Sequence, residues 1–401
     1  MANLDVLQLL RTVVDTSTSA TFTVPYQKAN TGSVHDEALL VERQAYPRVG
    51  VGTAFETGHV NKRGVMFDVS DEALHFTRNG QINFEAWAET IAAGTRAVRE
   101  RVHAMAANAM LRASDELGAI PVTGEAVNAG SYGVATGNEA MIKLQHFPVV
   151  QPYQAVDLQG AAIGTPRNII TLTLGGNAIP MWAGEDAGQS AGTYYRVLDY
   201  NRGLLMLVTE TGAPVTSQPT GTISYSRTEN VARFDLDTPA DTKDADHLNA
   251  AIQSIGRRKA RMAQDYYLSP DFLLMAHTVD DTLSNASQFM QSLRVDGSDT
   301  DAAGRVERLK NLPKYNIAAP GVVLGESRIL LGVRQSTTMH VAKPWAFSQP
   351  RPADVTVGDR VAYSGAQIAH GDEFSGLHTP QEYRKRYTSV LVHSSSERDA
   401  L

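Results

Sequence analysis

The sequence predicts an α+β fold organised around one long helix. Three observations predict it. Apolar residues keep a helical period throughout residues 83–118, residues 41–76 mix β-forming residues with glycines, and short β-type runs separated by turn residues fill residues 155–228. The expected molecule is a mixed body that carries an all-β insertion of sandwich or small-barrel type.

The long helix is the element on which the rest of the chain is expected to pack. Its apolar residues recur at steps of three, four or seven, which places them on one helical face: Phe84, Trp87, Ile91, Val98, Val102, Met105, Ala109, Ala113 and Leu117. Asn83 can cap the first turn, Ile82 can pack on Trp87, and Gly118 offers a left-handed stop. A helix from 84 to 117 would be about 51 Å long, so it needs a sheet or another subunit to lie on.

The other faces of this helix are charged. They carry acids and arginines at helical spacing: Glu85, Glu89, Arg96, Arg99, Glu100, Arg101, Arg112, Asp115 and Glu116. We expect these faces to contact solvent or a neighbouring subunit. Arg96, Arg99 and Arg101 are the candidate assembly contacts on this helix.

Composition describes an ordinary globular chain with an acidic balance. The 401 residues are 42% hydrophobic and 20% charged, which suits two or three domains with a sizeable core. The net charge of −7 argues against a dedicated nucleic-acid binder, which needs Lys and Arg to neutralise phosphates. No run is apolar over the length of a membrane span, and residues 1–20 lack a signal-peptide pattern, so we expect neither secretion nor membrane insertion.

Local motifs for catalysis, cofactors or metals are lacking. The chain has no cysteine, which excludes disulfides, thiolate metal sites and cysteine nucleophiles. Its eleven histidines are scattered without zinc spacing, and no phosphate loop, dinucleotide fingerprint or nucleophile elbow is present. The His-Gly-Asp-Glu run at 370–373 is expected in a solvated loop, and the acidic run at 296–301 lacks the closing glutamate of a calcium loop. We therefore predict a protein that is not an enzyme, with no catalytic, cofactor-binding or metal-binding residue.

The N-terminal segment is expected to form an arm that lies on something else. Residues 4–14 have the pattern of a short amphipathic helix. Residues 16–32 are rich in Thr, Ser and Asn and contain too few apolar residues to fold alone. Such an arm must bury its apolar side chains on neighbouring subunits.

A long thin hairpin is expected after the arm. Its strands, 46–55 and 60–67, are separated by a turn at 56–59, and it has few core residues of its own. Either it is a mobile surface loop or it reaches onto a neighbouring subunit. Lys62 and Arg63, at its edge, are candidate assembly contacts through ion pairs with a neighbour.

After the long helix, strands dominate the prediction. The expected strands of the all-β insertion are 168–174, 193–199, 204–208 and 222–225, with a hairpin turn at 200–203. A helix with apolar residues from Leu248 to Tyr266 follows, then a buried strand at 272–276 and a helix capped by Thr278 that runs to Leu293. The last expected strands are 315–323, 328–333, 339–345, 355–371 and 387–393.

Taken in order, these elements resemble the major capsid protein of tailed bacteriophages, of the Hong Kong 97 type. The resemblance is one of organisation and spans most of the chain. It is carried by the helix 83–118 as spine helix, the hairpin 41–76 as extended loop, the strand 271–276 with its following helix, and residues 325–334 with the strand to Trp345. The β insertion departs from the minimal fold, and the lack of a long charged helical N-terminal segment implies a separate scaffold protein.

The resemblance implies five regions. They are an N-terminal arm (1–40), an extended loop hairpin (41–82), the spine helix with the start of the peripheral and axial body (83–154), a β insertion domain (155–230), and an axial domain with returning peripheral strands (231–401). It also implies a virion protein that assembles in the host bacterial cytoplasm, as hexamers and pentamers, into an icosahedral shell around double-stranded DNA.

The partners implied by the resemblance are further copies of the chain, a portal protein, a separate scaffold protein and a decoration protein. Contact with packaged DNA would be non-specific, and no membrane is involved. Two other readings share this organisation: a phage tail or surface receptor-binding protein, and an encapsulin-like nanocompartment shell. Some relatives lock their shells by an isopeptide bond from a lysine of the extended loop. Lys62 is the only lysine between 41 and 76, and we predict that its contact is non-covalent.

Overall fold

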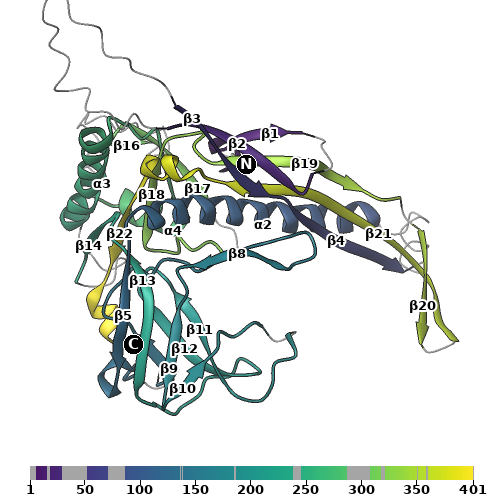
Figure 1. The fold of residues 1–401 in the computed structure, drawn as a ribbon, viewed down its shortest axis with the longest axis horizontal. Helices are drawn as coiled ribbons and strands as arrows, with labels where there is room; N and C mark the ends of the chain where they lie inside the picture. The colour runs from purple at the N-terminus through teal and green to yellow at the C-terminus, as the bar shows by residue number, and fades with distance from the viewer. Residues whose placement is uncertain are drawn as a thin grey trace, which may run out of the picture.

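Helix α2 (Ala86–Leu117) runs along the middle of an elongated α+β molecule (Figure 1). The computed structural model describes residues 6–15, 19–28, 52–70, 86–135, 137, 139–184, 187–237, 245–286, 308–317, 321–349, 351–357 and 360–400. The predicted helix is confirmed from Ala86 onward, while its expected cap and staple, Asn83 and Ile82, lie outside the described residues. The left-handed stop at Gly118 is wrong. A Cβ there would lie 2.5 Å from the backbone nitrogen of Asn230, so this glycine permits close approach of the chain instead.

The two halves of α2 differ in burial. Between residues 88 and 101 the described side chains are exposed or half-buried, whereas from Val102 onward most residues are buried, including Ala106, Met110 and Leu111, on more than one face of the helix. The single apolar face expected from the sequence is therefore wrong for the second half, because sheets and loops enclose that half of the helix. Leu117, placed on that face, is 38% exposed.

A six-stranded mixed sheet packs against the enclosed half of α2, in the order β14-β22-β18-β15-β17-β16. Its strands are β14 (Val231–Asp235), β15 (Phe272–Ala276), β16 (Arg308–Leu309), β17 (Leu312–Ile317), β18 (Arg328–Gly332) and β22 (Tyr387–His393). The strands expected at 272–276, 328–333 and 387–393 are confirmed. The strand expected at 315–323 is wrong over residues 321–323, which lie in a stretch of turns with one irregular position, and its residues 318–320 lie outside the described residues.

Alternate residues of this sheet reach two different cores. Phe272 and Leu274 face α2, whereas Leu273 and Met275 face α3 and α4 on the other side. These helices are α3 (Ala245–Tyr266) and α4 (His277–Ser284). Both expected helices are present, but α4 ends at Ser284 with Asn285 as its C-cap, so its expected continuation through Ala286 is wrong. Thr278 is not its cap either, because the N-cap position is Ala276 and makes no side-chain hydrogen bond.

A second sheet also packs along α2 and shares a core with it. Its order is β1-β19-β21-β20, with β4 also paired to β21. The strands are β1 (Arg11–Val14), β4 (Asn61–Ser70), β19 (Thr338–Phe347), β20 (Arg351–Val357) and β21 (Arg360–His378). The strand expected at 355–371 is in fact a hairpin of β20 and β21.

The N-terminal segment packs on its own chain. The helix expected over 4–14 is wrong: a short 3-10 helix, η1 (Val6–Leu9), is followed by β1, which pairs in parallel with β19. Val6, Leu9 and Leu10 are buried in the core that contains α2. This part of the arm thus buries its apolar residues without a neighbouring subunit, contrary to the expectation.

The predicted hairpin of 46–55 with 60–67 is also wrong. Strand β3 (Gly52–His59) runs through the expected turn and pairs with β2 (Thr21–Lys28), while β4 pairs with β21. A Cβ on Gly58 would lie 2.3 Å from the ring of Phe22, so the glycine admits this ring between the strands and the body. The resulting two-stranded ribbon of β2 and β3 is the described part of the projecting segment.

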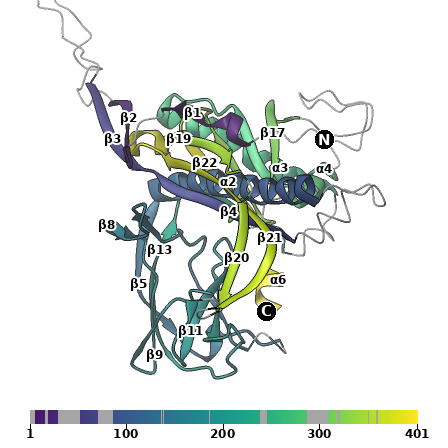
Figure 2. The ribbon, with the colours of Figure 1, turned by 90° about the vertical axis from the view of Figure 1, so that its right-hand side faces the viewer.

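An all-β unit hangs on the opposite side of α2 from the ribbon, as both views show (Figures 1 and 2). One sheet has the order β10-β9-β13-β5 and the other β11-β12-β6, and their side chains share one core. The strands of these sheets are β5 (Ala119–Val127), β6 (Met141–Lys143), β9 (Thr171–Leu174), β10 (Asn177–Ile179), β11 (Thr193–Asp199), β12 (Leu204–Thr209) and β13 (Gly221–Thr228), with the 3-10 helix η2 (Ala129–Ser131). Strands β7 (Tyr153–Val156) and β8 (Ala162–Arg167) pair with each other as a separate hairpin.

The start of this unit differs from the expected boundary. β5 pairs with β13 and β6 pairs with β12, so strand pairing includes residues from Ala119 rather than from 155. The hairpin turn at 200–203 is confirmed, with Gly203 at a φ of 65°. The remaining elements are the 3-10 helix η5 (Gln381–Arg386) and α6 (Ser395–Ala400). Among the described helices, none has an apolar stretch long enough to cross a membrane.

Candidate functional site

The two candidate contacts on β4 have different surroundings. The Nζ of Lys62 lies 3.8 Å from Oδ2 of Asp372, and the side chain is 56% exposed. Arg63 is 12% exposed, with its Nη1 3.5 Å from Oε1 of Glu373 and 3.1 Å from the carbonyl oxygen of Ser375. Arg63 therefore fastens β4 to β21 within the chain, and Lys62 remains available to a neighbour.

These pairs correct the interpretation of residues 370–373 as a solvated loop. Asp372 and Glu373 lie in β21, are almost fully buried, and hold the cations of β4 together with Lys343. In the part of the chain that the structure describes, no group of three or more potential ligands is arranged to hold a metal ion.

The three candidate contacts on α2 are exposed. Arg96, Arg99 and Arg101 lie in the half of the helix that is not enclosed. Burial lowers the pKa of Arg63, Glu373 raises it, and the positive charge of Arg101 lowers it further, which places Arg101 near the root of β4. The exposed half of α2 thus presents several cations beside β4.

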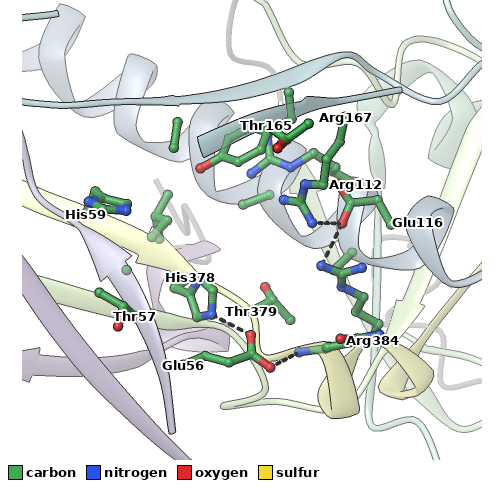
Figure 3. Close-up of a pocket in the computed structure, with 17 residues that line it drawn as sticks. Glu56, Thr57, His59, Arg112, Glu116, Thr165, Arg167, His378, Thr379 and Arg384 are labelled. Carbon is green, nitrogen blue, oxygen red and sulfur yellow. Dashed lines mark hydrogen bonds and ion pairs between the residues drawn. The ribbon is translucent and has the colours of Figure 1, made fainter. Parts of the chain in front are cut away.

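Sequence reasoning missed a charged pocket of about 350 Å³ where five parts of the chain meet. Strand β3, helix α2, the β7–β8 hairpin, β21 and η5 each contribute to its wall. Figure 3 shows the side chains that carry charge or can titrate there: Glu56, His59, Arg112, Glu116, Arg167, His378 and Arg384. No local motif signals this pocket, because its cations come from three distant parts of the sequence.

Glu116 is the centre of one wall. Its Oε2 lies 2.9 Å from Nη1 of Arg167 and 2.9 Å from Nη2 of Arg384, and its side chain is 6% exposed. Its Oε1 is buried and has no hydrogen-bond partner among the described residues. One carboxylate thus serves two guanidinium groups from different elements.

Arg112 lies one helical turn before Glu116. Its guanidinium carbon is 3.9 Å from the ring centroid of Tyr153, which Arg167 also approaches at 5.0 Å. Burial lowers the pKa of Arg112; Tyr153 and Glu116 raise it, and the charges of Arg167 and Arg384 lower it again. Arg112 makes no ion pair within the described part of the chain.

Glu56 occupies the opposite wall and fastens the ribbon to the body. Its Oε2 lies 2.9 Å from Nε2 of His378, and its Oε1 accepts a hydrogen bond of 2.9 Å from the backbone N–H of Gln381. Burial lowers the pKa of His378, although the carboxylate of Glu56 acts in the opposite direction. β3, β21 and η5 are thereby joined at one side chain.

The chemistry available in this pocket is charge recognition. A histidine oriented by a carboxylate is present, but the hydroxyl groups among the pocket-lining residues are those of threonines and Tyr153. No contact between a hydroxyl and His378 accompanies the Glu56 contact among the described residues, so the arrangement of a nucleophile with its base is not formed.

No protein-family model and no curated protein matches the chain. Solved structures of phage capsids resemble it along nearly its whole length. The capsid of the cyanophage P-SCSP1u is 9% identical at a TM-score of 0.47, covering 97% of this chain and 87% of that chain. The mature capsid of bacteriophage PhiM1 is 9% identical at a TM-score of 0.46, and the match covers 98% of this chain and 88% of that chain. A structure from Mycobacterium phage Bobi is 12% identical at a TM-score of 0.44, and the match covers 98% of this chain and 91% of that chain. Likeness at this level assigns neither a family nor an activity.

Proposed function

We propose that the chain is the major capsid protein of a tailed phage, a structural protein whose copies build a closed shell around double-stranded DNA. Hexamers and pentamers are its assembly units. It has no enzymatic activity, and its place is the virion capsid after assembly in the host bacterial cytoplasm.

The shape of the molecule supports this function most directly. The β20–β21 hairpin extends away from the two cores at one end of α2 (Figure 1), and the β2–β3 ribbon projects from the body in Figure 2, although its Phe22 and Val24 are buried against β19 and β21. The first half of α2 meanwhile has no fully buried side chain in its described part. Thin projections and an uncovered helix are costly in a monomer, since their surfaces gain little from burial. Repeated contacts with neighbouring copies would cover them.

The order of the elements supports the same function. A ribbon precedes the long helix, and a strand, a helix and further strands follow the all-β unit, which is the arrangement on which the sequence resemblance depends. In this proposal α2 is the spine helix, the ribbon is the root of the extended loop, and the all-β unit is an insertion on the outer face. The five regions from 1–40 to 231–401 keep their proposed roles. The one change is that the insertion starts at Ala119 instead of residue 155, so that β5 and β6 belong to it.

The proposed partners follow from the shell. Neighbouring copies contact Lys62, Arg96, Arg99 and Arg101, while Arg63 acts indirectly by fixing β4. A portal protein, a separate scaffold protein and a decoration protein complete the particle. Packaged DNA is contacted without sequence specificity, in keeping with the net charge of −7.

Electron microscopy of the purified full-length protein, with and without a co-expressed scaffold, tests this function. We expect closed shells of uniform diameter. Trimers or fibres in both preparations would instead indicate a tail or receptor-binding protein and would overturn the proposal. Shells that form around protein cargo and never package DNA in infected cells would indicate a nanocompartment.

A further inference from the structure

The pocket beneath the ribbon holds an unbalanced positive charge on its α2 wall. Arg112, Arg167 and Arg384 converge there, and Glu116 is the carboxylate among them. Because Glu116 already pairs with Arg167 and Arg384, Arg112 has only the face of Tyr153 as a described partner. The carboxylate of Glu56 lies across the pocket and is occupied by His378 and Gln381.

Such a charge is costly unless an anion accompanies it. Arg112 is compensated only in part, because Glu116 is already shared by two other guanidinium groups and Tyr153 offers the face of a ring. Burial lowers the pKa of Arg112 most, and the charges of Arg167 and Arg384 lower it further, against the opposite effects of Tyr153 and Glu116. Packing alone does not call for an arginine at this position, which lies beside the buried alanines Ala109 and Ala113 on the helix.

We propose that this pocket binds a compact oxyanion, held mainly by the guanidinium groups of Arg112 and Arg167. Planar guanidinium groups suit bidentate contacts with phosphate or carboxylate oxygens. Hydroxyl groups of Thr57, Thr165 and Thr379 also line the space and can donate further hydrogen bonds. A pocket of about 350 Å³ with mostly polar walls suits a small charged group rather than an apolar ligand.

Two sources can supply this chemistry: free phosphate, or the carboxylate of an acidic side chain from a second copy of the chain. The second source rests on the proposed function, whereas the first does not. Occupancy of the site would then depend either on the phosphate concentration around the protein or on contact with a neighbouring subunit beside β3.

Thermal unfolding of the unassembled full-length chain, with inorganic phosphate against sodium chloride at equal ionic strength, tests binding without requiring shells. We expect phosphate to raise the Tm of the wild type and of the control Arg261→Gln, an exposed arginine on α3. Arg112→Gln and Arg167→Gln should each weaken phosphate binding by about tenfold or more, the loss expected for a charge-assisted contact. Arg167 is 43% exposed, so its variant tests the site even if Arg112→Gln fails to fold.

Assembly in the same buffers separates the two sources. If a carboxylate of a second copy is the ligand, Arg167→Gln lowers the assembled fraction and added phosphate lowers it for the wild type by competition. If free phosphate is the ligand, added phosphate leaves the wild-type assembled fraction equal or higher. The inference would be overturned if phosphate raised the Tm no more than sodium chloride does. It would also be overturned if phosphate raised the Tm of the pocket variants as much as that of Arg261→Gln. Failure of all variants to form shells, with phosphate binding intact, would count against the proposed function alone.

Discussion

Arg328 is a fully buried cation that connects three parts of the molecule. Its side chain on β18 pairs with Asp115 of α2, and its Nη2 donates a hydrogen bond of 2.9 Å to Oγ of Ser389 on β22. Its Nη1 lies 3.2 Å from Oδ1 of Asn201, in the turn between β11 and β12. Asn201 in turn donates to the carbonyl oxygen of Leu324 at 3.1 Å. This network joins the long helix, the central sheet and the all-β unit.

Replacing Arg328 by Met should therefore destabilise the chain strongly. Asp115 would remain buried without its counter-ion, and breaking a buried pair in this way typically costs about 3–5 kcal/mol. Urea denaturation at pH 7 measures the loss. Arg261→Met, at a side chain that is 70% exposed, should change stability by less than about 0.5 kcal/mol. Adding Asp115→Leu to Arg328→Met should recover part of the loss, and equal effects of the Arg328 and Arg261 variants would contradict this account.

His378 should make stability depend on pH. Burial lowers its pKa below the ordinary value of 6.5, so the unfolded chain binds this proton more tightly than the folded chain. Its contribution to stability is fully present above about pH 6.5 and is lost as the pH falls from there through the folded-state pKa. His393, whose pKa burial also lowers, acts in the same direction.

The free energy of unfolding, measured by urea titration between pH 7.5 and 5.5, checks this dependence. We expect wild-type stability to fall with decreasing pH by at most about 1.4 kcal/mol per pH unit for each histidine. His378→Gln should reduce that slope, leaving the part due to His393. The exposed residue His370 supplies the control, because His370→Gln should leave the slope unchanged. A His378→Gln curve parallel to the wild type would refute the assignment.

At the scale of elements, the all-β unit should fold by itself only with its complete strand set. Its core includes Tyr132, Ile142 and Leu144, which precede the boundary expected from the sequence. β5 and β6 also supply edges on which β13 and β12 pair. A fragment of residues 119–228 should therefore give a β-type circular dichroism spectrum and a cooperative melt, whereas residues 155–228 alone should not. A cooperative melt of the shorter fragment would show that the first two strands are dispensable.

The sequence predicts elements that have a local signal, but it does not predict which strands pair when the two lie far apart in the sequence. Strands β15 and β22 begin and end where the sequence indicates, because each is a short segment rich in β-forming or apolar residues that is completely buried except at the end of β15. The pairing of β3 and β4 was misassigned, since adjacent strands with glycines resemble a hairpin although each pairs with a distant strand. The pocket could not be predicted for the same reason. The sequence indicates only that Arg112 and Glu116 lie on charged faces of the helix, whereas Arg167 and Arg384 reach them from distant parts of the chain.

At the scale of the whole molecule, charge is distributed unevenly. The chain has a net charge of −7, yet the exposed half of α2 presents Arg96 and Arg99. In the proposed shell this cationic stretch meets an acidic surface of the next copy, and many weak contacts add up through multivalency. Assembly should then weaken as salt rises, because exposed charges are screened.

The double variant Arg96→Gln with Arg99→Gln tests this contact. We expect a lower assembled fraction at low salt and a smaller difference from the wild type at high salt, measured by sedimentation. The matched control carries Arg257→Gln with Arg261→Gln, two exposed arginines on α3, and should assemble like the wild type. Equal assembly of both double variants at every salt concentration would exclude Arg96 and Arg99 as contacts.

We predict that Lys62 makes no covalent bond to a neighbouring copy in the proposed shell. Lys62 is the second residue of β4. Its Nζ lies 3.8 Å from Oδ2 of Asp372 and 5.9 Å from the ring centroid of Phe374, so its own chain already supplies a carboxylate and an aromatic face. Because Asp372 and Phe374 already engage this side chain, we expect a contact through charge rather than a covalent bond. Assembled particles denatured by boiling should therefore run on a gel as monomers near 43.4 kDa. Ladders from dimer to hexamer that disappear in Lys62→Ala, and persist in Lys343→Ala, would instead establish a cross-link through this lysine.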